Sequence, residues 1–283
     1  MNEPMLSLLL TLGGAEVRME KEGNFRILSA SGLETGEFET DHTENAVLDG
    51  GRADGARMKS RRIVLEAEYV GSDPEGERYE MISLLRPGGA GTLHVDRGRG
   101  ERVTSVLLTG AECTQENLYD PLRFRLSLLC PDPYFYAAEP VVLPLRERVP
   151  LLFSPVFSFA GDGLSGGLCG PVRAVPVVNP GDAPVGVVAE LYAAGGDVTD
   201  PLIRNMGRVV TVPGVLHRGE RLLLSTEPGQ RRVEKNGEPF YGFDRQSEFF
   251  TLPCGLSLVT AAAAAGMTDL DGRITFRPKY YGA

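Results

Sequence analysis

Short segments of alternating apolar and polar residues run through most of the chain, and turn residues interrupt them at close intervals. Clear examples of this alternation are residues 63–69 and 124–128. A period of two places successive side chains on opposite faces of a strand. Breaks such as Gly13-Gly14 and Gly71-Ser72-Asp73 come too often for long helices. The sequence therefore predicts a mainly β protein.

The alternation predicts strands in both parts of the chain. In the first part they are expected at residues 7–12, 25–30, 62–69, 92–95, 104–109 and 122–129. In the last part they are expected at residues 175–178, 185–192, 208–212, 221–225, 231–234, 248–252, 256–260 and 273–277. Asn236-Gly237 is typical of a tight hairpin. Many short strands with frequent turns favour a β-sandwich in the last part.

One segment has helical features instead. Asp73 is a good N-cap residue, Pro74 suits the first helical position, and Pro87-Gly88-Gly89 would stop the helix. An apolar stripe at helical spacing is predicted to pack on the sheet, formed by Tyr79, Met81, Ile82 and Leu85. The first part is therefore predicted to contain a sheet with one α-helix packed on it.

Residues 139–150 divide the chain. Pro140, Pro144 and Pro150 prevent a regular helix there, and the intervening residues are partly charged. We therefore predict an N-terminal domain of residues 1–137 and a C-terminal domain of residues 138–283, whose residues 138–172 include the linker. The two domains are expected to fold apart.

The negative charge is concentrated in the first domain. Residues 1–137 contain 15 basic and 23 acidic residues, a net charge of −8, whereas residues 138–283 contain 14 and 15, a net charge of −1. The densest acidic segment contains Glu34, Glu37, Glu39, Asp41, Glu44 and Asp49. Such a surface repels phosphate groups. A solvated loop without a function is the alternative for this segment.

Several other classes of protein and site do not fit the sequence. No apolar run approaches the ~18 residues of a membrane span, and residues 5–12 lack the basic flank of a signal peptide. The four cysteines form no C-x-x-C pair, so neither a metal site nor a cofactor is predicted.

Catalysis is also not predicted. Residues 163–167 match G-x-S-x-G around Ser165, but Pro171 and Pro176 oppose the helix that a nucleophile elbow requires. Only His217 follows as a base, and His42 and His94 are isolated. The chain is predicted not to be an enzyme, with a serine hydrolase at Ser165 as a remaining alternative.

Two basic clusters lack the aromatic residues that single-strand nucleic-acid binders use for stacking. The clusters comprise Arg57, Lys59, Arg61 and Arg62, and Arg97, Arg99 and Arg102. We interpret both as solvated strand edges, or as partners of an acidic surface on a neighbouring subunit.

A series of short motifs follows the chain in order. In the first domain they include Gly32-Leu33, Asp49-Gly50-Gly51, Arg61-Arg62-Ile63-Val64-Leu65 and Cys130-Pro131-Asp132-Pro133-Tyr134-Phe135. In the second they include Asn179-Pro180-Gly181-Asp182-Ala183, Phe249-Phe250-Thr251-Leu252 and Tyr280-Tyr281-Gly282-Ala283. Together these motifs resemble the siphophage distal tail protein (Dit) family over almost the whole chain.

The resemblance implies a fold and a role. It implies a sandwich-like first domain that closes into a hexameric ring, and a galectin-like β-sandwich as the second domain. The implied function is that of a structural virion protein, made in the bacterial host cytoplasm, which joins the tail tube protein to the baseplate hub or tail-tip protein. Tape measure and receptor-binding proteins are further implied partners, and DNA would pass through the lumen without specific binding.

Two expectations follow for the surface. Because DNA must slide through the lumen, we predict that Glu37, Glu39 and Asp41 face the channel or its rim and repel the phosphates.

The alternative function is a carbohydrate-binding module for host attachment, given the galectin-like second domain. The chain has no Trp, the best aromatic platform for a sugar ring.

Overall fold

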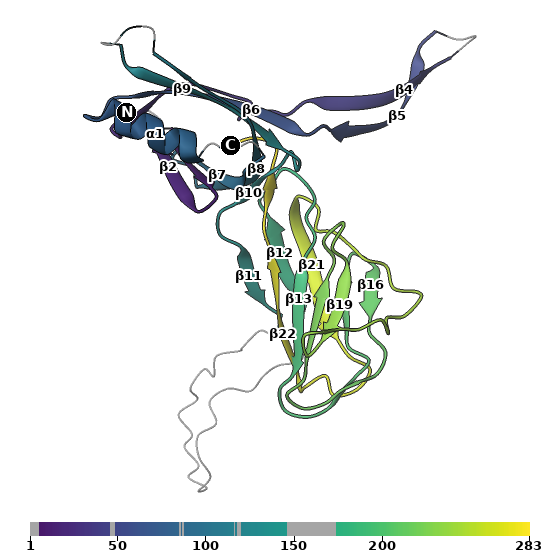
Figure 1. Ribbon diagram of the computed structural model, residues 1–283. Coiled ribbons are helices and arrows are strands. Elements are labelled where there is room, and N and C mark those ends of the chain that lie inside the picture. The colour runs from purple at the N-terminus through teal and green to yellow at the C-terminus, as the bar shows by residue number, and fades with distance from the viewer. Residues whose placement is uncertain are drawn as a thin grey trace, which may run out of the picture. The chain divides into compact units, whose positions relative to one another are not determined.

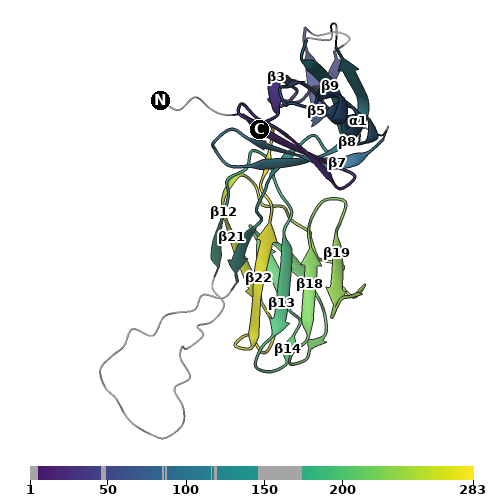
Figure 2. The ribbon, with the colours of Figure 1, turned by 60° about the vertical axis from the view of Figure 1, so that its left-hand side comes forward.

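The computed structural model describes residues 6–45, 49–84, 86, 88–115, 117, 120–145 and 174–283. The chain divides into two compact units (Figures 1 and 2). The first unit comprises Met1–Glu139 and Lys279–Ala283, and the second comprises Pro140–Pro278. The chain thus leaves the first unit and returns to it with its last five residues. Independent folding of the two parts stays a prediction.

A nine-stranded sheet, in the order β23-β10-β8-β7-β1-β2-β3-β6-β9, forms the first unit. Its strands are β1 (Ser7–Leu12), β2 (Ala15–Met19), β3 (Phe25–Ser31), β6 (Arg61–Tyr69), β7 (Ala90–Asp96), β8 (Arg102–Thr114), β9 (Leu122–Cys130), β10 (Phe135–Ala137) and β23 (Lys279–Tyr280). β8 pairs with β7 through its first half and with β9 through its second half. The sheet therefore closes into a barrel-like arrangement, which covers edges that an open sheet would expose.

Alternate residues of these strands fill the interior of the first unit. The predicted rows in β6 and β9 are buried, and both belong to one hydrophobic core. Phe25 packs against Phe124 with ring centroids 5.7 Å apart. Full burial of such side chains contributes about 1.5–3 kcal/mol each. The period-two pattern is thereby confirmed as the origin of this core.

Helix α1 (Pro74–Leu84) begins where the sequence predicted. The backbone N–H of Gly76 donates a hydrogen bond to Oδ1 of Asp73 at 2.9 Å, so Asp73 is the N-cap. The helix contributes a side chain to the core through Met81, which is 1% exposed.

The predicted apolar stripe on α1 is wrong. Tyr79 and Ile82 are 74% and 59% exposed, whereas Arg78 on the inward side is half-buried. Nη2 of Arg78 donates to Oε1 of Gln115 at 2.6 Å, whereas Nε of Arg78 is buried and finds no hydrogen-bond partner among the described residues. The face of α1 that packs on the first unit is therefore of mixed polarity. Leu85 lies outside the described residues.

Two sheets and a short strand pair form the second unit. The six-stranded sheet contains β11 (Val141–Pro144), β22 (Leu270–Phe276), β13 (Val188–Ala193), β18 (Arg221–Ser225), β19 (Arg232–Lys235) and β20 (Glu238–Pro239) in that order. The four-stranded sheet contains β12 (Val175–Asn179), β21 (Gly255–Ala262), β15 (Leu202–Asn205) and β16 (Arg208–Thr211). The pair is β14 (Val198–Thr199) with β17 (Val215–Leu216).

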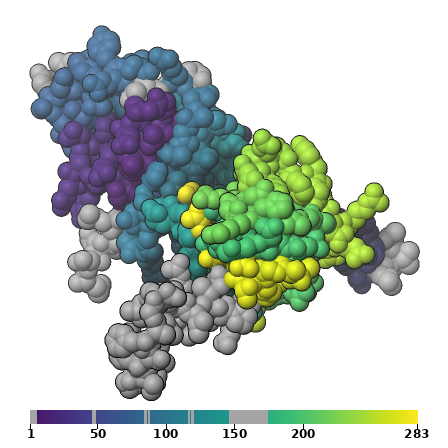
Figure 3. Space-filling view, turned by 90° about the horizontal axis from the view of Figure 1, so that it is seen from below, coloured from purple at the N-terminus to yellow at the C-terminus, as the bar shows by residue number. Residues whose placement is uncertain are grey.

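The two sheets of the second unit share one core, which makes the unit a β-sandwich. Leu191, Leu224 and Ile274 from the larger sheet lie in the same buried cluster as Ile203 and Val259 from the smaller one. Segments far apart in sequence lie side by side on its surface, as the green and yellow regions of Figure 3 show. The mainly β fold is confirmed, while the galectin-like detail of this unit stays a prediction.

Local turn chemistry was predicted better than strand ends. Asn236 and Gly237 have φ of 55° and 86° and connect β19 to β20, as their tight-hairpin signal indicated. The strand predicted at residues 248–252 is wrong, because only Leu252 forms a bridge, with Val185.

Candidate functional site

A two-stranded arm of β4 (Phe38–Glu44) and β5 (Gly51–Met58) extends away from the closed sheet of the first unit (Figure 1). Most of its residues are exposed. The acidic segment is thus a solvated hairpin and not a loop, because cross-strand hydrogen bonding organises it. A two-stranded sheet without a core is marginally stable in water, and neither outer edge of this one pairs with another described strand.

The arm has one ionic face near its root. Glu39 lies opposite Arg57 in the register. Arg57 contacts Oε2 of Glu39 through Nη2 at 2.7 Å and Nε at 2.9 Å, and Nζ of Lys59 lies 3.8 Å from Oε1. The hydrogen bond from Arg57, and then the charge of Lys59, lower the pKa of Glu39. The negative charge of Glu39 is therefore matched within the chain.

The other two predicted acidic residues differ from Glu39. Glu37 precedes β4, and its carbonyl oxygen accepts a hydrogen bond from the backbone of Lys59 at 2.9 Å. Asp41 lies next to a register shift in β4. Both side chains are exposed, and neither forms an ion pair with another described residue. Glu39 and Asp41 therefore lie on the arm and Glu37 lies directly before it, and Glu37 and Asp41 are the two whose carboxylates have no ion-pair partner among the described residues.

The root of the arm is fixed by a buried arginine. Arg61 at the start of β6 is 3% exposed. Its Nη1 donates to the carbonyl oxygens of Gly32 at 2.8 Å and Glu34 at 2.9 Å, and its Nε donates to that of Pro133 at 2.9 Å. Its Nη2 donates to the carbonyl oxygen of Tyr281. Burial lowers the pKa of this guanidinium.

This corrects the interpretation of Arg61 as a solvated edge residue. A guanidinium carries five N–H donors in a rigid fork, so it can satisfy several buried carbonyl groups at once. Arg102 departs from its predicted role in a similar way: its guanidinium carbon lies 4.0 Å from the ring centroid of Tyr280. It also donates to the carbonyl oxygen of Gly282.

Residues Lys279–Ala283 complete this anchor, and we call them the return segment. The N–H of Ala283 donates to the carbonyl oxygen of Leu33 at 2.8 Å. A Cβ on Gly282 would lie 2.4 Å from the carbonyl oxygen of Glu34, so the close approach requires glycine. The ring of Tyr281 contacts that of Phe38, the first residue of β4, with centroids 6.2 Å apart. The return segment therefore contacts the residues directly before the arm and the first residue of the arm itself.

The Asp-Pro-Tyr-Phe motif meets the same segment. The hydroxyl of Tyr136 donates to Asp132, and Nζ of Lys279 lies 5.9 Å and 5.4 Å from the rings of Tyr134 and Tyr136. Burial, and then the neighbouring Tyr281, raise the pKa of Tyr134. The two motifs lie far apart in the sequence, and nothing in their local pattern predicted that they meet.

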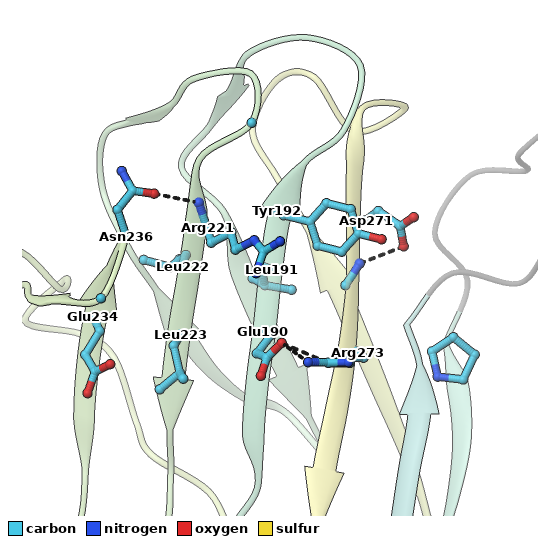
Figure 4. Close-up of a pocket in the computed structure, with 14 residues that line it drawn as sticks. Glu190, Leu191, Tyr192, Arg221, Leu222, Leu223, Glu234, Asn236, Asp271 and Arg273 are labelled. Atoms are coloured by element: carbon cyan, nitrogen blue, oxygen red, sulfur yellow. Dashed lines mark hydrogen bonds and ion pairs between the residues drawn. The ribbon is translucent and has the colours of Figure 1, made fainter.

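A groove of about 1180 Å³ lies on the second unit, over the outward face of its six-stranded sheet (Figure 4). Two cross-strand rows form its floor. The first row contains Arg273, Glu190, Leu223 and Glu234, and the second contains Asp271, Tyr192 and Arg221. The concavity, the aromatic ring and the charged groups make this face a candidate ligand site.

The described residues contain no group of three or more His, Cys, Asp and Glu side chains that could hold a metal ion. Two histidines pair singly with carboxylates: His94 lies 2.6 Å from Glu101, and His217 lies 3.0 Å from Asp197. His42 is exposed on the arm. Ser165 and its G-x-S-x-G motif lie outside the described residues. No helix in the described part of the chain is long and apolar enough to cross a membrane.

Comparison by sequence yields no matching family model and no matching curated protein. Comparison by structure yields a match with SPP1 Dit, described as a paradigm of the hub adsorption apparatus in phages that infect Gram-positive bacteria. The TM-score is 0.69 at 15% identity, over 96% of this chain and 98% of that chain. Two chains from the phage P2 baseplate align with TM-scores of 0.48 at 9% and 10% identity. The chain thus has the Dit fold over nearly its full length.

Proposed function

We propose that the chain is a structural component of a phage or prophage tail, located at the hub of the baseplate or tail tip. The observation that carries the proposal is the full-length fold shared with SPP1 Dit, at a TM-score of 0.69. A match confined to one unit would leave the other unit's role open, whereas this one covers 98% of the Dit chain. In this role the chain would be part of the virion, in contact with the tail tube protein and the hub or tip protein.

The finer proposal is a homohexameric ring. It is supported by the arm, whose exposed strands lack a core of their own. Pairing of this arm with a neighbouring subunit would bury its open edges and its exposed Phe38. Ring closure is the symmetric way in which such head-to-tail contacts end without forming a filament. Tape measure and receptor-binding proteins remain further proposed partners.

The ring is tested by native mass spectrometry over a range of concentrations, with and without tail tube protein. The informative variant joins Thr40 to Ala56, which face each other across the arm, through an Asn-Gly turn. We expect the intact chain to form hexamers and the shortened chain to stay monomeric with unchanged thermal unfolding of the first unit. Glu44→Gln, which keeps the arm intact, is the control. A monomeric intact chain under all these conditions would contradict the proposal.

We further propose that DNA passes through the ring and that Glu37, Glu39 and Asp41 keep the wall from binding it. Because Arg57 pairs with Glu39, the proposed repulsion comes mainly from Glu37 and Asp41. Its range is about 8 Å at physiological salt. Reversal of Glu37 and Asp41 to Lys should leave tails assembled but slow genome ejection at low ionic strength. Reversal of the exposed Glu16 and Glu22 should not, and equal ejection by both double variants would contradict the idea.

The alternative function is attachment to a host glycan. The observation that favours it is the groove on the second unit, which combines Tyr192 with charged side chains (Figure 4). Lectin activity and the structural role are compatible, since the groove and the arm belong to different units. The two functions are separable by experiment, because one is read as sugar binding and the other as assembly.

A further inference from the structure

Most charged groups around the groove are already paired within the chain. Arg273 contacts Oε2 of Glu190 through Nη2 at 2.7 Å and Nε at 2.8 Å. Nε of Arg232 lies 2.6 Å from Oε1 of Glu234. A ligand that bound these groups would have to compete with an existing ion pair, so we do not assign them to ligand recognition.

Two other charged groups lack such partners. The guanidinium of Arg221 forms no hydrogen bond or ion pair with any described residue. Asp271 accepts a hydrogen bond at Oδ1 from the N–H of Gly272, at 2.7 Å, and forms no ion pair within the described ranges. The groove thus offers one unmatched cation and one unmatched anion to a ligand.

The register fixes how these two groups are spaced. Tyr192 in β13 lies opposite Asp271 in β22 on one side and opposite Arg221 in β18 on the other. Neighbouring strands are about 4.8 Å apart, so the backbones of Arg221 and Asp271 are about 10 Å apart. Figure 4 shows the three side chains in one line across the sheet, with Tyr192 in the middle.

We infer that this groove binds an acidic saccharide, a sugar that carries a carboxylate or phosphate group. An unpaired guanidinium recognises planar or tetrahedral oxyanions through charge-assisted hydrogen bonds. An unpaired carboxylate accepts hydrogen bonds only, and sugar hydroxyl groups are the donors that would satisfy it. An aromatic ring between the two suits the apolar face of a sugar ring. The line from Arg221 through Tyr192 to Asp271 therefore orients the sugar, with its anionic group at Arg221.

The same line disfavours other ligands. A simple anion at Arg221 gains nothing from Asp271, and a nucleic acid brings phosphates toward Asp271, Glu190 and Glu234. A neutral sugar satisfies Asp271 but leaves the Arg221 guanidinium without a counter-charge. The inference goes beyond the proposed structural role, because it assigns a ligand class to the unit that does not carry the arm.

The test uses the full chain and matched sugars. Binding of tetrasaccharides of galacturonate, glucuronate and mannuronate, and of hexose phosphates, is measured by ligand-observed NMR and by calorimetry. Methyl-esterified galacturonate tetrasaccharide has the same sugar rings without the charge, so it serves as the neutral control. We expect at least one acidic sugar to bind, and its neutral counterpart to bind at least about tenfold more weakly, as expected for loss of a charge-assisted hydrogen bond. Absence of binding by every acidic sugar, or equal affinity for the charged and esterified forms, would overturn the inference.

Protein variants locate the site. Arg221→Gln should weaken acidic-sugar binding at least about tenfold. Arg204→Gln removes the same charge from an exposed position in β15, on the other sheet of this unit, and should leave binding unchanged. Equal effects of the two variants would refute the assignment to the groove. Both variants should assemble like the parent chain, so failure of sugar binding is distinguishable from failure of the proposed ring.

Discussion

Replacement of Arg61 by Met should destabilise the first unit and loosen the root of its arm. The guanidinium donates to the carbonyl oxygens of Gly32, Glu34, Pro133 and Tyr281. Met keeps much of the apolar packing but has no donor, so these carbonyl groups would lose this buried partner. The four acceptors lie at the arm root, in the Asp-Pro-Tyr-Phe motif and in the return segment, so the variant removes contacts that join these three parts of the first unit.

The magnitude follows from the hydrogen bonds and from burial of the charge. Four bonds at about 1.5 kcal/mol each give a favourable sum of about 6 kcal/mol. Burial of the guanidinium, the cause of its lowered pKa, opposes this sum by about 3 kcal/mol. The expected net loss is about 3 kcal/mol, a large share of the 5–15 kcal/mol that typically stabilises a domain.

Urea unfolding followed by circular dichroism measures this loss, and limited trypsin digestion reports on the arm root. Arg62→Met is the matched control, since Arg62 is the next residue, is exposed, and forms no side-chain bond with the described residues. We expect a change within about 0.5 kcal/mol for the control. Arg61→Lys, which keeps the charge but not the fork, should fall between the two. Equal stability of Arg61→Met and Arg62→Met would refute the argument that Arg61 anchors the arm.

Three further outcomes are expected. Met81→Ala should lower the free energy of unfolding by about 2–4 kcal/mol because Met81 is buried, whereas Ile82→Ala on the exposed side of α1 should lower it by under about 0.5 kcal/mol. Equal losses of stability in thermal unfolding would contradict the observed helix face. Gly282→Ala places a Cβ against a backbone carbonyl oxygen and should lower the stability of the first unit by about 1–3 kcal/mol. Amide hydrogen exchange in the return segment should become faster, and an unchanged exchange rate would contradict the close fit at this glycine. Since Arg57 lowers the folded-state pKa of Glu39, their pairing should stabilise the arm at pH above the usual Glu pKa, and this stabilisation should be lost as the pH falls through the lowered pKa. In Arg57→Gln, NMR titration should show the pKa of the Glu39 carboxylate returning toward its ordinary value. The same Glu39 titration in the variant and in the parent chain would contradict the pairing.

Much of the fold was predictable because its signals are local. Strand β6 and its buried row lie where the sequence predicted them, since alternation along one strand decides which residues face the core. The Asp73 cap and the Asn236-Gly237 turn act over three or four residues, so they too are visible in the sequence. The acidic segment was also visible, although its organisation into an arm was not, because its residues lack the apolar alternation of a core strand.

The remainder depended on contacts between distant residues. Arg61 and Tyr281 are separated by 220 positions, and no local pattern at either residue specifies the hydrogen bond between them. The inward face of α1 was decided by the surface on which the helix packs, so Arg78 lies inward and Ile82 outward. The line of Arg221, Tyr192 and Asp271 likewise depends on strand register in the assembled sheet. The sequence by itself determined which residues could form strands and turns, because those preferences act between neighbours. Only the tertiary structure decided which strands lie side by side, since that choice depends on burial and hydrogen bonding across the whole unit.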